Sequence, residues 1–146
     1  KTSDDNIYGA GDVSGLRPIW PVAVKEGIIA AGNMVGIHRK MTDFFASKST
    51  MNFLGIPSMS LGNVNPEDDS YSVEIKETKD SYKKIVHKNG KITGAILQGD
   101  LAYGGILQQL IANKIDVTKV KKPIFDVDYS DFFNIRENFE YYYDEQ

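Results

Sequence analysis

The residues best suited to do chemistry lie near the start of the chain, where a β-prone run, Asn6 to Tyr8, leads into Gly9-Ala10-Gly11-Asp12. Glycines at positions 9 and 11 let a ligand approach the backbone closely. Asp12 follows the predicted strand, and the carboxyl ends of strands are where open α/β sheets bind ligands. These residues alone leave two interpretations equally open: a ligand site, or a glycine-rich turn capped by an aspartate.

The same residues distinguish between two kinds of ligand. A dinucleotide-phosphate fingerprint requires G-x-G-x-x-G. Here Ser14 occupies the third glycine position and Gly15 comes one place late. An ionised aspartate only accepts hydrogen bonds, so Asp12 suits a ligand that carries hydroxyl groups better than a phosphate.

A helix is predicted to follow this segment. Pro21 is a favourable first-turn residue, and Gly36 is placed to end the helix. Small residues recur along one face at Ala23, Gly27 and Ala31. The start of the helix should present N–H groups and a partial positive charge to whatever Asp12 also faces.

The run T-S-D-D-N-I-Y-G-A-G-D-V, followed by a Pro-led helix that ends A-A-G-N-M-V-G, resembles the second FAD-binding motif of the pyridine nucleotide-disulfide oxidoreductase superfamily. The resemblance implies that Asp12, next to Gly11, binds a ribityl hydroxyl of FAD. It also implies that the helix start points at the pyrimidine end of the flavin. The corresponding residues here are Val22, Ala23 and Val24. Gly9 departs mildly from the family, which commonly has alanine there.

The composition of the chain argues against several other classes of protein. The 146 residues are 41% hydrophobic and 25% charged with net charge −3, which is typical of a soluble globular protein and gives no nucleic-acid signal. The absence of cysteine excludes disulfides, thiolate metal sites and a cysteine nucleophile within the chain. No apolar run is long enough for a membrane span, and no signal peptide is recognisable. We therefore expect a cytoplasmic protein with no membrane or nucleic-acid partner.

The second part of the chain has the pattern of an antiparallel sheet with one helix. Asn89-Gly90 predicts a hairpin between strands at 81–86 and 91–98. Asp100 is expected to cap a helix from Leu101 to Asn113. Three further strands are expected at 50–54, 58–62 and 71–76.

The block from Gly94 to Ile111 resembles the C-terminal domain of the NADH oxidase, NADH:rubredoxin oxidoreductase and nitrite reductase large-subunit branch. In that branch a hairpin strand ending in G-D runs into a helix of the form G-x-L-x-x-L-I.

Beyond this block the pattern is less regular. A short helix is predicted from Asp116 and an extended segment at 123–129. The acidic, aromatic tail is expected to pack on its own domain, although docking on a partner is an alternative. No catalytic residue can be nominated from any pair of carboxylates or Ser-His-Asp set, and two distant histidines predict no metal site.

The predicted fold class is α/β. Residues 1–40 are expected to be the incomplete C-terminal segment of a Rossmann-like FAD-binding domain, and residues 41–146 an α+β unit. Because the chain begins on Lys1 within a motif, we expect a C-terminal piece of a longer protein whose FAD and NAD domains are its natural partners. A homodimer and an electron-acceptor protein are further expected partners.

The resemblance implies a parent enzyme that passes electrons from NAD(P)H through FAD to rubredoxin, O2, nitrite or a disulfide. We expect the isolated chain to lack FAD and activity. The alternative is a non-catalytic interface or dimerisation module that binds no cofactor.

Overall fold

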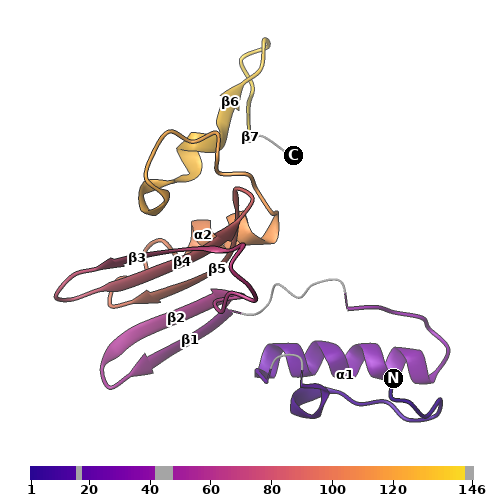
Figure 1. Cartoon of the computed structure of the whole chain (residues 1–146). Helices are drawn as coiled ribbons and strands as arrows, with labels where there is room; N and C mark the ends of the chain where they lie inside the picture. Colours follow the sequence, from indigo (N-terminus) through magenta and orange to yellow (C-terminus); the bar gives the residue numbers. More distant parts are fainter. Residues whose placement is uncertain (16–17, 42–47, 144–146) are drawn as a thin grey trace. The chain divides into compact units, whose positions relative to one another are not determined.

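The chain divides into two compact units, Lys1–Ser49 and Thr50–Gln146. This computed structural model describes residues 1–15, 18–41 and 48–143. Figure 1 shows the elements of each unit, which are described separately below. Among the described residues, no helix is both long enough and apolar enough to cross a membrane.

The described residues of the first unit form a short 3-10 helix, η1 (Gly11–Ser14), and an α-helix, α1 (Trp20–Met34). Pro21 lies in the first turn of α1, as predicted. Gly36 follows the helix with a φ of +82°, and the Ile37 N–H closes the end on the Gly32 carbonyl at 2.9 Å. The predicted helix is therefore confirmed at both ends.

The strand predicted at Asn6–Tyr8 is wrong. Residues 1–10 form turns instead, closed by hydrogen bonds from the Thr2 N–H to the Ile7 carbonyl at 3.0 Å and from the Ile7 N–H to the Asp4 carbonyl at 3.3 Å. A strand needs a neighbour for its N–H and C=O groups, and the described part of this unit offers none.

The second unit is built on a five-stranded sheet of order β1-β2-β5-β4-β3. The strands are β1 (Lys48–Phe53), β2 (Ile56–Gly62), β3 (Ser72–Glu77), β4 (Tyr82–Lys88) and β5 (Lys91–Gln98). β5 pairs with both β2 and β4 in antiparallel register. Asn89 and Gly90 have φ values of +50° and +75°, so they form the predicted two-residue turn.

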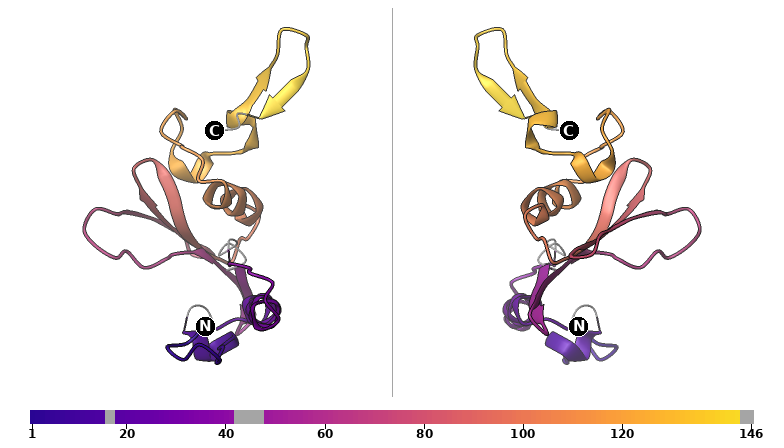
Figure 2. Two further views of the ribbon diagram at one scale, coloured as in Figure 1. Left: turned by 90° about the vertical axis from the view of Figure 1, so that its right-hand side faces the viewer. Right: turned by 90° about the vertical axis from the view of Figure 1, so that its left-hand side faces the viewer.

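Helix α2 (Gly104–Ala112) packs on one face of this sheet, as Figure 2 shows. The buried side chains between helix and sheet form the core: Met59, Leu61, Ile85, Ala95, Leu97, Ile106, Leu107, Leu110 and Ile111. A Cβ on Gly104 would lie 2.5 Å from the Met59 sulfur, so the glycine lets the helix approach closely. The α+β architecture predicted for this part is confirmed.

Asp100 is not the N-cap of α2. The cap position is Tyr103, with no side-chain cap bond. Asp100 instead accepts a hydrogen bond from the Ala102 N–H at 3.0 Å and one from the Lys83 ammonium at 2.8 Å. The Lys83 hydrogen bond, followed by the Ala102 N–H, lowers the pKa of Asp100 below its usual value. The aspartate therefore ties the loop after β5 to β4, and the helix begins three residues later than expected.

Two other local predictions are wrong. Asp116 begins no helix, because it forms a β-bridge with Lys91 and its carboxylate accepts bonds from the N–H and hydroxyl of Thr118. The segment predicted to be extended contains the 3-10 turns η3 (Ile124–Asp126) and η4 (Tyr129–Phe132). The Lys122 ammonium, 3.3 Å from Asp128 and 2.6 Å from Asp131, holds these turns together.

The tail packs on its own unit only in part. Val127 and Phe132 are buried. Strands β6 (Phe133–Ile135) and β7 (Tyr141–Tyr143) then form a hairpin that projects from the rest of the unit in both Figures 1 and 2. Phe139, in its loop, is 84% exposed.

The central strand yields a test of this packing. Gly94 lies where a Cβ would be 1.9 Å from the Asn63 carbonyl oxygen, a backbone atom that cannot move freely. We expect Gly94→Ala to lower the free energy of unfolding by about 1–3 kcal/mol through overpacking. Gly105→Ala is the matched control in α2, because the nearest atom is the Tyr129 hydroxyl at 3.9 Å. It should raise the free energy of unfolding by up to about 1 kcal/mol. Chemical denaturation of both variants checks the pair, and equal effects would contradict this account.

Candidate functional site

The predicted ligand-binding turn is formed by η1 and lies against the start of α1. Gly11 has a φ of +79°, a conformation that favours glycine, and a Cβ there would contact the Ala23 Cβ at 3.5 Å. The Gly15 N–H closes the turn on the Asp12 carbonyl at 3.1 Å. The structure therefore brings two of the predicted residues, Gly11 and Ala23, into contact.

The Asp12 carboxylate is exposed and forms no hydrogen bond to another described residue. It does not cap its own turn, since η1 has no side-chain cap bond. An exposed carboxylate with its acceptors free suits the hydroxyl-bearing ligand inferred from sequence. This geometry is compatible with the predicted role, and the assignment of Asp12 stays a prediction.

The three helix residues of the predicted site point in different directions. Val22 is buried, Ala23 is half-buried and Val24 is exposed. The N–H groups of Val22 and Ala23 both donate to the Ile19 carbonyl at 3.1 Å. Pro21 has no N–H, and the N–H groups of Val22 and Ala23 are already used. The start of the helix therefore offers a ligand fewer N–H donors than the sequence suggested. Its partial positive charge remains.

Glu26 is the residue that sequence reasoning missed. Its side chain is only 8% exposed, and it is the one buried charged residue among those the structure describes. One carboxylate oxygen accepts the Gly11 N–H at 2.6 Å, and the other accepts the Ser14 hydroxyl at 3.0 Å. A single side chain from the second turn of α1 thus holds both ends of η1.

This arrangement fixes the position of Asp12, which lies between the two residues that Glu26 holds. Hydrogen bonds to a charged group are worth about 1.5–3 kcal/mol each, more than neutral ones. A signal for Glu26 did exist in the sequence. It lies one helical turn after Val22, on the face that becomes buried, where an unpaired acid would otherwise be costly.

A cavity of about 430 Å³ lies beyond Glu26, between the N-terminal residues and the later turns of α1. Tyr8, Ile29 and Ala30 line it together with Glu26. None of the five predicted site residues lines this cavity. The cavity does touch η1, but through Val13 and Ser14, the two residues that follow Asp12.

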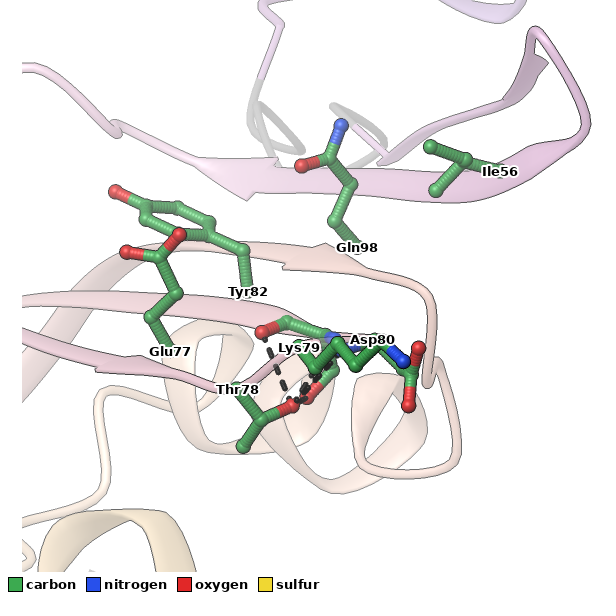
Figure 3. Close-up of a pocket in the computed structure, with 8 residues that line it drawn as sticks. Ile56, Glu77, Thr78, Lys79, Asp80, Tyr82 and Gln98 are labelled. Atoms are coloured by element: carbon green, nitrogen blue, oxygen red, sulfur yellow. Dashed lines mark hydrogen bonds between the residues drawn. The ribbon is translucent and has the colours of Figure 1, made fainter.

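The second unit has a pocket of its own, of about 320 Å³, where β2 and β4 begin and β5 and β3 end. Figure 3 shows Gln98, Tyr82 and Glu77 projecting to the same side from three neighbouring strands. They form a cross-strand row, since Tyr82 is paired with both Gln98 and Glu77. Leu97 contacts the α2 side, so its neighbour Gln98 faces away from the helix.

The floor of this pocket is the turn between β3 and β4. The Thr78 hydroxyl lies 2.8 Å from the Ser81 hydroxyl and accepts the Ser81 N–H at 3.1 Å. The row of Gln98, Tyr82 and Glu77 makes no side-chain hydrogen bond to a described residue. This row is thus polar and without side-chain partners among the described residues, but the pocket contains no arrangement that predicts catalysis.

Within the described residues, no group of three histidine, aspartate or glutamate side chains could hold a metal ion. His87 lies 3.3 Å from Glu74 at the edge of the sheet, as an ordinary surface pair. The candidate site therefore consists of η1 and the start of α1.

Comparison with known proteins agrees with this assignment of the fold. Residues 48–115 match the family described as the rubredoxin NAD+ reductase C-terminal domain. The crystal structure of NADH:rubredoxin oxidoreductase from Clostridium acetobutylicum matches with a TM-score of 0.62 and 26% identity, covering 84% of this chain and 33% of that one. The five-stranded antiparallel sheet with its helix is the fold of that enzyme's C-terminal domain.

Curated relatives extend the similarity. The chain is 26% identical to nitrite reductase [NAD(P)H] of Bacillus subtilis (strain 168), over 84% of this chain and 16% of the relative. It is 24% identical to pyridine nucleotide-disulfide oxidoreductase domain-containing protein 1 of Dictyostelium discoideum, over 92% of this chain and 32% of the relative. The assimilatory nitrate reductase electron transfer subunit of B. subtilis is 26% identical, over 86% and 17%.

The matched domain and the relatives together support a C-terminal part of a pyridine nucleotide-disulfide oxidoreductase. Within that group, the chain carries the C-terminal domain found in rubredoxin reductases and is similar to NAD(P)H-dependent nitrite reductase. It spans a third or less of the length of these relatives. The predicted relationship is confirmed, and the names of these relatives do not point to a single electron acceptor.

The contact made by Glu26 can be tested directly in this chain. Glu26→Leu removes the acceptor of the part-buried Gly11 N–H, which should cost about 1–3 kcal/mol locally. We expect amide exchange at Gly11 to become about 5- to 150-fold faster. Glu26→Gln keeps an oxygen acceptor and should restore most of the protection. Hydrogen exchange followed by NMR measures both variants. Unchanged exchange in Glu26→Leu would show that η1 does not depend on this side chain.

Proposed function

We propose that this chain is the C-terminal portion of a FAD-dependent NAD(P)H oxidoreductase, and that its first unit completes the FAD site of that enzyme. The observation that carries the proposal is the exposed carboxylate of Asp12, which has no hydrogen-bond partner among the described residues, on a turn fixed by Gly11 and Glu26. The names of the relatives support the oxidoreductase class, because they include NAD(P)H-dependent nitrite reductase and NADH:rubredoxin oxidoreductase.

Each residue of the site has a defined task in this proposal. Asp12 accepts a hydrogen bond from a ribityl hydroxyl, which orients the flavin chain. Gly11 keeps the backbone close to Ala23, so that the turn and the helix start form one continuous surface. Val22, Ala23 and Val24 bring the positive end of the α1 dipole to the pyrimidine side of the ring.

FAD, when bound, supplies hydride acceptance from NAD(P)H and onward electron transfer. The residues of this chain contribute position and electrostatics. With a flavin bound there, the partial positive charge at the start of α1 would favour negative charge on the flavin. No residue described here selects the acceptor, so rubredoxin, O2, nitrite and a disulfide are all compatible with this part of the enzyme.

The second candidate function is an interface module without a cofactor. The observation that favours it is the second unit, whose sheet has one face covered by α2 and an unpaired polar row on the other. In this case the unit would mediate dimerisation or cover the flavin, and η1 would be a structural turn. The two functions differ in whether Asp12 contributes to flavin affinity.

The chain alone should be colourless and should not oxidise NADH. Only the second half of the FAD motif is present, and one ribityl contact with one helix start is too little to hold a flavin. The absorbance spectrum of the purified chain, after incubation with excess FAD and gel filtration, measures this. A stoichiometric flavin absorbance band in the protein fraction would overturn the proposal that this chain carries only half of a FAD site.

In the full-length protein, Asp12→Ala should weaken FAD binding by about 1–3 kcal/mol, or about 5- to 150-fold in Kd, because a buried hydroxyl of the ligand loses its acceptor. Asp5→Ala is the matched control, since Asp5 is an exposed acid of the same segment whose carboxylate lies 2.7 Å from the Lys1 ammonium. It should leave FAD affinity unchanged. Equilibrium titration of the apoprotein with FAD gives both constants. Equal affinity of Asp12→Ala and wild type would favour the interface function.

A further inference from the structure

The hairpin formed by β1 and β2 lies in the longest part of the chain without charge. Residues 49–66 contain no aspartate, glutamate, lysine or arginine. At the other edge of the sheet, β3 carries Glu74, Lys76 and Glu77. Edge strands that face water usually carry such charges, because charges prevent pairing with another chain. β1 is an edge strand without this protection beyond Lys48.

The tip of the same hairpin is apolar and exposed. Met51 is 55% exposed, Phe53 59% and Leu54 88%, and Ile56 is also exposed. A two-residue turn at Leu54-Gly55 places Phe53 opposite Ile56, so both side chains lie on one face of the hairpin. Single exposed apolar residues are normal, but a contiguous set marks a contact surface.

Leu54 is also unfavourable for the turn itself. Its φ is +52°, in the left-handed region where glycine, asparagine and aspartate are common and a leucine is rare. Neither the backbone nor the solvent therefore favours leucine at this position. A residue that is unfavourable in both respects is most readily explained by a partner that covers its side chain.

The pocket of the second unit adjoins this tip. Ile56 lines the pocket together with Tyr82, Gln98 and Glu77. Figure 3 shows Ile56 and Gln98 on neighbouring strands with their side chains on the same side. An apolar patch bordered by unpaired polar groups has the anatomy of a protein interface, with an apolar centre and a polar rim.

We propose that the tip of the β1–β2 hairpin, Met51 to Ile56, is the surface on which the remainder of the parent protein packs. The chain covers only 16–33% of the relatives it matches, so most of such a protein lies outside it. The absence of charge over 49–66 favours a permanent contact within one protein, because obligate interfaces are more apolar than transient ones. This contact does not depend on the proposed flavin site.

Methionine oxidation tests the proposal with an internal control. The full-length protein and this chain are treated with dilute hydrogen peroxide, and sulfoxide is quantified peptide by peptide. In this chain Met51 should oxidise quickly, whereas Met59, buried under α2, should oxidise slowly. In the full-length protein we expect Met51 oxidation to slow at least tenfold, at every protein concentration, with Met59 unchanged.

Three results would overturn the proposal. Met51 could oxidise equally fast in both proteins, which would mean that the tip stays in water. Protection that grows with protein concentration would assign the surface to a second copy of the chain. Protection already present in this chain at high dilution would mean that the chain covers the tip itself. None of these results depends on flavin binding, so the proposed function is tested separately.

A variant gives an independent check. Leu54→Asn suits the positive φ better than leucine, so it should leave the unfolding midpoint of this chain unchanged or raise it. In the full-length protein the same variant should speed Met51 oxidation towards the rate in this chain, because it removes apolar contact area. A merely structural role of Leu54 would not produce opposite effects in the two proteins. Unchanged Met51 protection in full-length Leu54→Asn would contradict the role assigned to this side chain.

Discussion

The carboxylate of Glu26 is the contact on which the predicted cofactor-binding segment depends. It accepts hydrogen bonds from Gly11 and Ser14, and so joins η1 to α1, a helix of fifteen residues. The residues before η1 form no helix or strand. A small unit cannot hold such a turn by packing alone, since it buries little apolar surface. The two hydrogen bonds to Glu26 therefore fix the position of Asp12. The Glu26 side chain that accepts them is almost fully buried.

The second unit is organised differently. Strand β5 is hydrogen-bonded on both sides, and its alternate residues Ala95 and Leu97 lie in the core under α2. Its other face carries Gly94, which allows the Asn63 backbone to cross in contact with the sheet. This unit obtains its stability from apolar burial on one face, and that leaves the opposite face and the β1–β2 hairpin available for contact with other parts of a larger protein.

The sequence predicts the elements whose signals are local and fails where tertiary contacts decide. The bounds of β5 follow from Asn89-Gly90, because that dipeptide adopts the turn with almost any flanking strands. Asn6–Tyr8 has the residue types of a strand but no neighbour to pair with in the described part of its unit. Asp100 has the residue type of a helix cap, but its carboxylate accepts a hydrogen bond from Lys83, seventeen residues away in the sequence. Glu26 was missed because its role depends on its hydrogen-bond donors, the Gly11 N–H and the Ser14 hydroxyl. The sequence does not reveal the conformation that brings this segment to the helix.

The segment that follows the matched family region affects where this domain can be said to end. The family match stops at residue 115, but Asp116 bridges to Lys91 and the Val117 N–H bonds to the Gly90 carbonyl at 2.8 Å. Farther on, Val127 and Phe132 are buried. The packed unit is therefore longer than the region that the family model matches. A boundary drawn at the end of that match would separate Val127 and Phe132 from the rest of the core, so a version of this domain meant to fold by itself should extend at least through Phe132.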